Sequence, residues 1–276
     1  MKKSLPYIAV VLLGAGPLPA QDWAKALVDK SPRHLEWVTV KHGGREVGCY
    51  VGYPEVREKA TAILVIHDIW GLSHWARAVV DDFAAAGYIA IAPDLLWCAG
   101  AKGGGTAEFE SDQIGLKIRA LPAAQVTADL NAAAAYVAKL PAGNGKVVVA
   151  GFCWGGSQTF RFATNNRELK AAFVFYGDGP TDAAALARIA CPVLGFYGGN
   201  DLRINSSVPK SGEQMKAAGK FYEPVFYEGA GHGFMKAGQA PPPPADAEQK
   251  ARDDYAANRK ARTEAWQRLK AFMKKI

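Results

Sequence analysis

Cysteine is scarce in this chain of 276 residues, which has only four. Cys49, Cys98, Cys153 and Cys191 lie far apart, and none belongs to a CxxC pair. This spacing argues against a zinc site and against a small scaffold built on disulfides. We expect buried free thiols, although one disulfide among Cys49, Cys98 and Cys191 stays open, because an oxidising compartment would permit it.

Long apolar runs are absent after residue 20, so no stable membrane span is expected there. Residues 1–20 differ from the rest: a basic start, Met1-Lys2-Lys3, precedes a mostly apolar stretch that ends on Ala20. This layout predicts a secretory signal peptide cleaved before Gln21. A permanent anchor is the weaker interpretation, because the apolar stretch is short. We therefore expect a single domain over residues 21–276, exported to the periplasm or secreted.

Clustered charge of one sign is also absent. The formal net charge is +7, and loss of Lys2 and Lys3 with the leader would lower it to +5. The densest basic stretch, 250–275, also contains acidic residues, as a solvated helix face does. Nucleic-acid binding is therefore not expected. Because 49% of the residues are hydrophobic, the composition is that of a globular protein rather than a disordered one.

An alternation of buried strands and helices runs along the chain. Continuous apolar runs of this kind are typical of strands covered on both faces, and the alternation predicts a mostly parallel sheet between two helical layers. An antiparallel hairpin around Gly43-Gly44 comes first. The expected strands are 61–66, 88–92, 146–150, 171–176, 193–197 and 222–227, and the expected helices are 75–86, 123–138, 155–163, 213–218 and one near the C-terminus.

Two further stretches have no strand or helix pattern. Residues 95–112 are rich in glycine and small residues, and we interpret them as a loop over one end of the sheet. The four prolines at 241–244 are expected to form a stiff linker. A partner-binding role for this proline run stays open.

The sequence Gly151-Phe152-Cys153-Trp154-Gly155 stands between an expected strand and an expected helix. Small residues at both ends permit a strained strand-to-helix turn that lifts the central side chain clear of the sheet. The following helix N-terminus favours the reactive thiolate form. We therefore predict that Cys153 is a nucleophile. The alternative is a buried structural cysteine.

Two later segments could supply its partners. Asp201 follows the expected strand 193–197, and His232 follows the expected strand 222–227 among small residues. The chain order of nucleophile, acid and histidine is that of the α/β-hydrolase fold, in which the acid orients the histidine and the histidine activates the nucleophile. Alone, Asp201 could cap a turn and His232 could be a surface loop residue.

The oxyanion site should come from two backbone amides. In this fold one amide belongs to the residue after the nucleophile and the other to the loop after an early strand. The predicted donors are therefore Trp154 and Ile69. Both act through the main chain.

Together these motifs resemble the dienelactone hydrolase family over roughly residues 38–276. The resemblance rests on residues 67–71 (HDIWG), 87–88 and 92–95 (GY and APDL), 151–156 (GFCWGG), Asp201 and residues 231–234 (GHGF). It implies a carboxylic ester or lactone hydrolase with an acyl-cysteine intermediate, a small-molecule substrate, and no metal or organic cofactor.

Two positions depart from the family pattern. The family holds its resting nucleophile with an acidic residue, usually Glu, where this chain has Asp68, so Asp68 is a candidate gate or a simple loop cap. The family also binds its dienelactone carboxylate with arginines, one of them shortly after the histidine. Lys236 stands there and cannot form a bidentate fork. Arg119 and Arg203 are the possible substitutes, or surface cations.

Two other functions remain open from sequence alone. The fold could serve a non-catalytic protein that binds small molecules, which the complete set of Cys153, Asp201 and His232 argues against. Thiol redox chemistry would need a resolving cysteine close by, and none is near Cys153 in the sequence.

Overall fold

The computed structural model describes residues 22–276, so the predicted leader at 1–20 lies outside the described residues. Its centre is an eight-stranded sheet with the order β1-β2-β4-β3-β5-β6-β7-β8. The pairs from β4 to β8 are parallel, whereas β1 and β2 are antiparallel. The strands are β1 (Leu35–His42), β2 (Arg45–Gly52), β3 (Ala60–Ile66), β4 (Ile89–Pro93), β5 (Gly143–Phe152), β6 (Ala172–Phe175), β7 (Val193–Gly198) and β8 (Tyr222–Tyr227).

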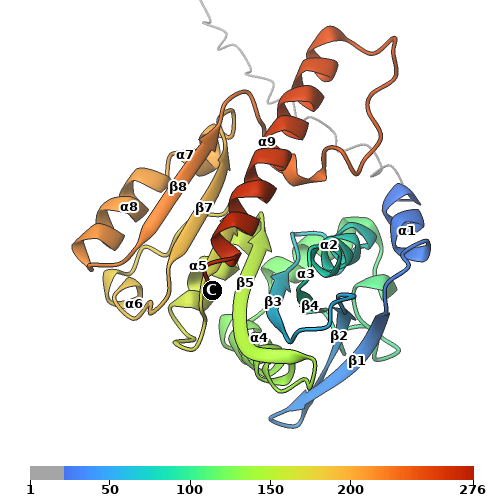
Figure 1. The fold of residues 1–276 in the computed structure, drawn as a ribbon, viewed down its shortest axis with the longest axis vertical. Coiled ribbons are helices and arrows are strands. Elements are labelled where there is room, and N and C mark those ends of the chain that lie inside the picture. The colour runs from blue at the N-terminus through green and yellow to red at the C-terminus, as the bar shows by residue number, and fades with distance from the viewer. Residues whose placement is uncertain (1–21) are drawn as a thin grey trace, which may run out of the picture.

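Helices cover both faces of the sheet (Figure 1). One apolar layer packs the sheet against α1 (Asp22–Asp29), α2 (His74–Ala85) and α9 (Gln249–Met273). The other packs it against α4 (Ala123–Ala138), α5 (Trp154–Ala163), α6 (Ala183–Leu186) and α8 (Val208–Ala217). The alternation of strands and helices thus gives the predicted α/β architecture, a mostly parallel sheet between two helical layers.

Several expected elements match the structure closely. The hairpin joins β1 to β2 through Gly43 and Gly44, which both have positive φ, as a tight two-residue turn requires. Helix α4 has the predicted bounds. The helix expected near the C-terminus is α9, which packs on the sheet with Leu269 and Met273 buried.

Helices α3, α6 and α7 and a short 3-10 helix were not predicted. The expected loop 95–112 holds a short 3-10 helix, Thr106–Glu108, and α3 (Ser111–Arg119) begins at its end. Helix α7 (Leu202–Asn205) follows Asp201 directly, and α6 is equally short. Helix α3 escaped the sequence pattern because only Gly115 and Ile118 of its nine residues are buried, so it lacks a clear apolar stripe.

All four cysteines are free thiols in the described chain. Cys49 and Cys191 are buried, where burial raises the pKa of Cys49 to about 12 and that of Cys191 to about 11. Cys98 corrects the expectation of buried thiols, because it lies exposed in the loop after β4. Cys153 is partly exposed.

Candidate active site

Cys153 lies at the turn between β5 and α5. Its backbone has φ 57° and ψ −119°, in a region that residues with a side chain seldom occupy. The turn is tight on both sides. A Cβ on Gly155 would stand 2.2 Å from the carbonyl oxygen of His67, and one on Gly151 would stand 2.2 Å from that of Gly155. The glycines of the motif therefore permit the close packing that sets Cys153 at the end of the strand.

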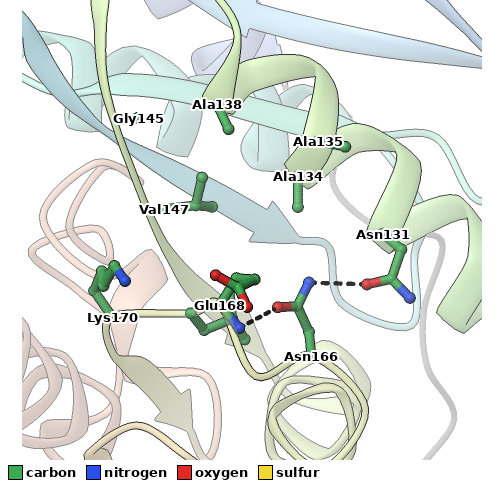
Figure 2. A pocket seen from close by; sticks show the side chains of 10 residues that line it. Asn131, Ala134, Ala135, Ala138, Gly145, Val147, Asn166, Glu168 and Lys170 are labelled. Atoms are coloured by element: carbon green, nitrogen blue, oxygen red, sulfur yellow. Dashed lines mark hydrogen bonds between the residues drawn. The ribbon is translucent and has the colours of Figure 1, made fainter.

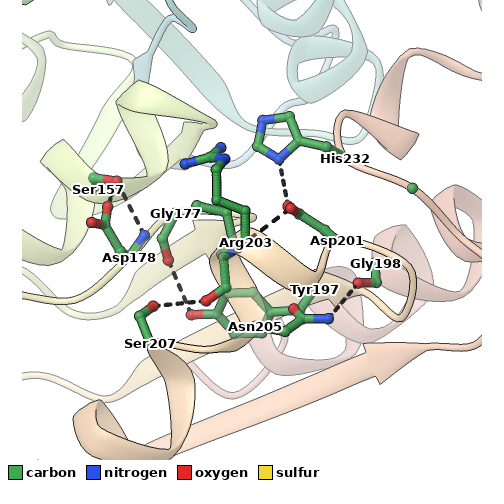
Figure 3. A network of polar contacts seen from close by, with 12 residues as sticks. Ser157, Gly177, Asp178, Tyr197, Gly198, Asp201, Arg203, Asn205, Ser207 and His232 are labelled. Atoms are coloured by element: carbon green, nitrogen blue, oxygen red, sulfur yellow. Dashed lines mark hydrogen bonds and ion pairs between the residues drawn. The ribbon is translucent and has the colours of Figure 1, made fainter. Parts of the chain in front are cut away.

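His232 and Asp201 come together as neighbours. Asp201 is the N-cap of α7, and its Oδ1 accepts a hydrogen bond from the Ile204 amide at 3.4 Å. Its Oδ2 lies 2.5 Å from Nδ1 of His232, a contact visible in Figure 3. The imidazole also lies close enough to Cys153 for that side chain to raise the pKa of the ring. The three side chains therefore form one continuous chain of contacts from carboxylate to imidazole to thiol.

The electrostatics of His232 follow from these contacts. Burial favours the neutral ring and by itself would lower the pKa of His232. Hydrogen bonds and negative charge from Cys153 and Asp201 outweigh that effect, so the pKa of His232 is raised above its ordinary value. The contacts around the ring thus favour its protonated form.

The predicted oxyanion donors lie at the same cavity. Ile69 and Trp154 line it together with Cys153. Trp154 is the first residue of α5, so its amide is one of the helix N-terminal N–H groups that have no acceptor within the helix. Ile69 belongs to a loop ordered by Asp68, whose Oδ1 accepts from the Trp70 amide at 2.9 Å.

The two predicted gating and substrate residues contact each other. Nζ of Lys236 lies 2.8 Å from Oδ2 of Asp68, and Asp68 is only 3% exposed. The same ammonium group stands 4.8 Å above the ring of Trp75, a cation–π arrangement. Lys236 therefore neutralises a buried carboxylate instead of presenting a free charge to the cavity.

The cavity beside Cys153 has a volume of about 440 Å³. Arg119, at the end of α3, and Arg203, in α7, line it. Neither guanidinium has a carboxylate partner within residues 22–276, whereas Lys236 does. Figure 3 shows Arg203 extending between His232 and Asp178. The cavity lining thus contains two guanidinium groups and one carboxylate, that of Asp178.

Sequence reasoning missed three residues with polar side chains that line this cavity, Ser157, Tyr176 and Asp178. Ser157 and Asp178 hydrogen-bond to each other, and the Asp178 amide donates to the Ser157 hydroxyl at 3.1 Å. Two signals could have found them. Ser157 is one helical turn after Cys153 on α5, and Tyr176 and Asp178 follow β6, whose end lies beside that of β5.

A second cavity, of about 430 Å³, lies at the opposite ends of β5 and β6 (Figure 2). Ala134, Ala138 and Val147 form much of its wall, and Asn166 donates to Asn131 at 2.8 Å on its rim. None of the predicted catalytic side chains borders it. The chemistry therefore concentrates at the Cys153 cavity.

Residues 22–276 contain neither a metal-binding cluster of side chains nor a membrane-spanning helix. No cluster of three or more His, Cys, Asp and Glu side chains has a metal-binding arrangement there. No helix in this part of the chain has both the length and the apolar character of a membrane span.

Comparison with known proteins identifies a family model and several relatives that match the chain. Residues 47–276 match the model of the dienelactone hydrolase family. A protein of Salmonella typhimurium named "Putative carboxymethylenebutenolidase" is 32% identical over 202 residues, which cover 69% of this chain and 74% of that protein. A protein of the same name from Methylorubrum extorquens is 34% identical over 185 residues, 62% of each chain.

Solved structures agree with the fold. The crystal structure titled "Putative Dienelactone Hydrolase" from Klebsiella pneumoniae matches with a TM-score of 0.72 and 26% identity, covering 88% of this chain and 99% of that one. A dienelactone hydrolase-like promiscuous phosphotriesterase from metagenomic libraries has a TM-score of 0.70 at 19% identity, over 88% of this chain and 98% of that one, which shows the fold alone. With the family model covering most of its length, the chain belongs to the dienelactone hydrolase family of ester and lactone hydrolases.

Proposed function

We propose that the protein hydrolyses a carboxylic ester or lactone through an acyl-cysteine intermediate. The observation that carries the proposal is the continuous contact from Asp201 through His232 to Cys153, whose sulfur is presented on a strained turn beside a cavity. A thiol placed in this way next to an imidazole is the arrangement of an activated nucleophile.

The reaction has two halves. His232 takes the thiol proton, the sulfur attacks the substrate carbonyl carbon, and the carbonyl electrons move onto its oxygen. The amides of Ile69 and Trp154 stabilise that oxyanion. When the carbonyl re-forms, the bond to the alcohol oxygen breaks and His232 returns the proton to that oxygen. A lactone ring opens at this step.

Water then releases the acyl group. His232 takes a proton from water, the hydroxide oxygen attacks the thioester carbon, and the carbon–sulfur bond breaks. The proton held by His232 then restores the Cys153 thiol as the acid leaves. Asp201 keeps the imidazole in its tautomer throughout both halves. The reaction consumes one water per ester.

We infer a substrate that bears an anionic group near its reacting carbonyl. Arg119 and Arg203 line the cavity without carboxylate partners in the described chain, whereas Lys236 already pairs with Asp68. Arginine can form a planar two-bond contact with a carboxylate, which lysine cannot. The gate that the resemblance implies for Asp68 would require its carboxylate to leave Lys236 for the sulfur, and it stays a prediction.

Export is proposed on the sequence of residues 1–20 alone. The mass of the protein recovered from the periplasm or medium of a producing cell tests it. A mass that begins at Gln21 is expected, and an intact Met1 in the cytosol would contradict it.

The test of catalysis is Cys153→Ala, assayed with p-nitrophenyl esters. Hydrolysis should fall to background, and wild-type protein quenched during turnover should gain the mass of one acyl group on Cys153. The exposed thiol Cys98 supplies the control, because Cys98→Ala should retain full activity. Undiminished hydrolysis by Cys153→Ala would exclude the mechanism, and slow alkylation of Cys153 would favour a non-catalytic binding protein.

A further inference from the structure

Tyr176 follows β6 directly and has a backbone φ of +40°. Positive φ is rare for a bulky residue, and such strain persists only where the surroundings impose it. Cys98, Cys153 and Tyr176 are the only non-glycine residues of the described chain with positive φ. Two of these three, Cys153 and Tyr176, line the same cavity.

The sheet brings Tyr176 beside the nucleophile. Phe152 of β5 and Phe175 of β6 are register partners, and Cys153 and Tyr176 are the next residues on the two strands. The Cys153 amide donates to the Phe175 carbonyl at 3.0 Å, which fixes this relation. The Tyr176 ring also meets the His232 ring edge-on, with 5.0 Å between centroids. Tyr176 therefore lines the cavity next to Cys153 in the sheet and contacts the ring of His232.

The hydroxyl of Tyr176 is an unsatisfied group. The residue is only 1% exposed, and its hydroxyl proton has no acceptor within the described chain, while the Met235 backbone interacts with the oxygen. Leaving a buried hydroxyl without an acceptor is energetically unfavourable. The phenol oxygen is close enough to Asp68 and Cys153 to sense their charge. An acceptor that appears during the reaction would satisfy it.

The Tyr176 hydroxyl also keeps its proton over the pH range in which the enzyme would act. Burial, followed by the negative charges of Asp68 and Cys153, raises the pKa of Tyr176 well above its ordinary value. The Met235 backbone and Arg262 act in the opposite direction and do not cancel the rise. Tyr176 is thus a permanent donor rather than a base.

We propose that the Tyr176 hydroxyl donates a hydrogen bond to the sulfur of Cys153 once His232 has removed the thiol proton. This inference rests on the proposed function. A neutral thiol is a weak acceptor, whereas a thiolate is negatively charged, so the bond strengthens only on ionisation. Tyr176 then stabilises the reactive form of the nucleophile and not its resting form, as catalysis requires.

Asp68 is the other acceptor near the hydroxyl, but its oxygens already face Lys236 and the Trp70 amide. The sulfur is the atom whose charge changes during the reaction. Several other charged groups surround Cys153 and Tyr176. They are Asp68, Asp178, Asp201, His232, Lys236, Arg119, Arg203 and Arg262. Replacing Tyr176 by phenylalanine removes none of them, so their influence is common to both proteins.

The experiment is the pH dependence of Cys153 alkylation by iodoacetamide, followed by mass spectrometry of the peptide that contains it, in the full chain. Tyr176→Phe should move the profile to higher pH by about one unit, which corresponds to about tenfold slower alkylation below the wild-type inflection. The plateau at high pH should not change. The acid limb of ester hydrolysis should shift in parallel. A 3-fluorotyrosine at position 176 keeps the donor and should not show this upward shift.

Tyr227→Phe is the matched control. Tyr227 is also buried, its hydroxyl proton also has no acceptor within residues 22–276, and its ring also lies 5.3 Å from that of Phe234, as the Tyr176 ring does. Its charged neighbour is Glu264. The variant should leave the profile unchanged.

Superimposed profiles for wild type and Tyr176→Phe would overturn the role of Tyr176, as would an equal shift in Tyr227→Phe. Wild-type Cys153 that reacts no faster than Cys98 would instead overturn the proposed nucleophile, and this inference with it. The two failures are therefore distinguishable.

Discussion

Lys236 and Asp68 form an ion pair in which Nζ lies 2.8 Å from Oδ2. The lysine stands where the family resemblance implies a substrate-binding arginine, and the aspartate where it implies a gate. Because Asp68 is nearly inaccessible to water, its charge depends on Lys236 for compensation. The pair joins the loop after β3 to the loop that carries His232.

Breaking this pair should destabilise the fold. Lys236→Met leaves a buried carboxylate uncompensated, and we expect the free energy of unfolding to fall by about 3 kcal/mol. Urea denaturation at neutral pH measures the change. The double variant Asp68→Asn, Lys236→Met should recover most of the loss, because it removes both charges. Equal stability of wild type and Lys236→Met would show that water compensates Asp68.

Arg119 and Arg203, which have no carboxylate partner within residues 22–276, should select anionic substrates. Arg203→Gln is expected to raise KM for p-nitrophenyl hemisuccinate about tenfold, the equivalent of about 1.4 kcal/mol, and to leave KM for p-nitrophenyl butyrate nearly unchanged. Arg119→Gln should act in the same direction. Arg167→Gln, an exposed arginine outside the cavity lining, is the control. Equal changes in KM for the two esters would show that the arginines do not select substrates by charge.

Asp201→Asn should affect stability in a way that depends on pH. The pKa of His232 is raised in the folded protein. Protonation of His232 therefore stabilises the fold fully below the pKa of the unfolded state, about 6.5, and this stabilisation is lost as pH rises through the folded pKa. Asparagine can still cap α7 but carries no charge. The melting temperature of Asp201→Asn should therefore fall further below wild type at pH 5.5 than at pH 9. A difference independent of pH would contradict the coupling.

Gly155→Ala tests the packing of the strained turn. Its Cβ would stand 2.2 Å from the His67 carbonyl and 2.3 Å from that of Ile66, both backbone atoms. We expect a loss of about 3 kcal/mol in the free energy of unfolding, together with reduced alkylation of Cys153. Gly212→Ala is the control, because a Cβ there meets nothing within 4 Å and the residue is in α8. It should stabilise by about 0.5–1 kcal/mol.

The sequence was informative where local chemistry determines structure. Buried strands such as β3 are continuous apolar runs, and the glycines around Cys153 mark a turn that few other residues permit. The contact between Asp201 and His232 could be expected only as a consequence of chain order and strand ends. The structure brings these residues together with Cys153, Ile69 and Trp154, while their catalytic roles stay predictions.

Long-range pairing is what the sequence could not supply. Nothing local to Lys236 indicates that its partner is Asp68, because the two lie on separate loops. Helix α3 lacks a strong apolar stripe, so the sequence of residues 95–119 did not predict that this helix places Arg119 at the cavity. Tyr176 looked like the last residue of a buried strand, and only its backbone angle distinguishes it from the rest of that strand.

The backbone of Cys153 has a consequence for how this protein can change. The conformation that presents the sulfur is one that glycine would adopt without strain, so the most reactive residue is also poorly suited to its own position. Selection for folding alone would replace it. A cysteine that persists there in homologous chains would therefore record selection for turnover, and its loss to glycine would mark a lineage that had abandoned the reaction but kept the scaffold.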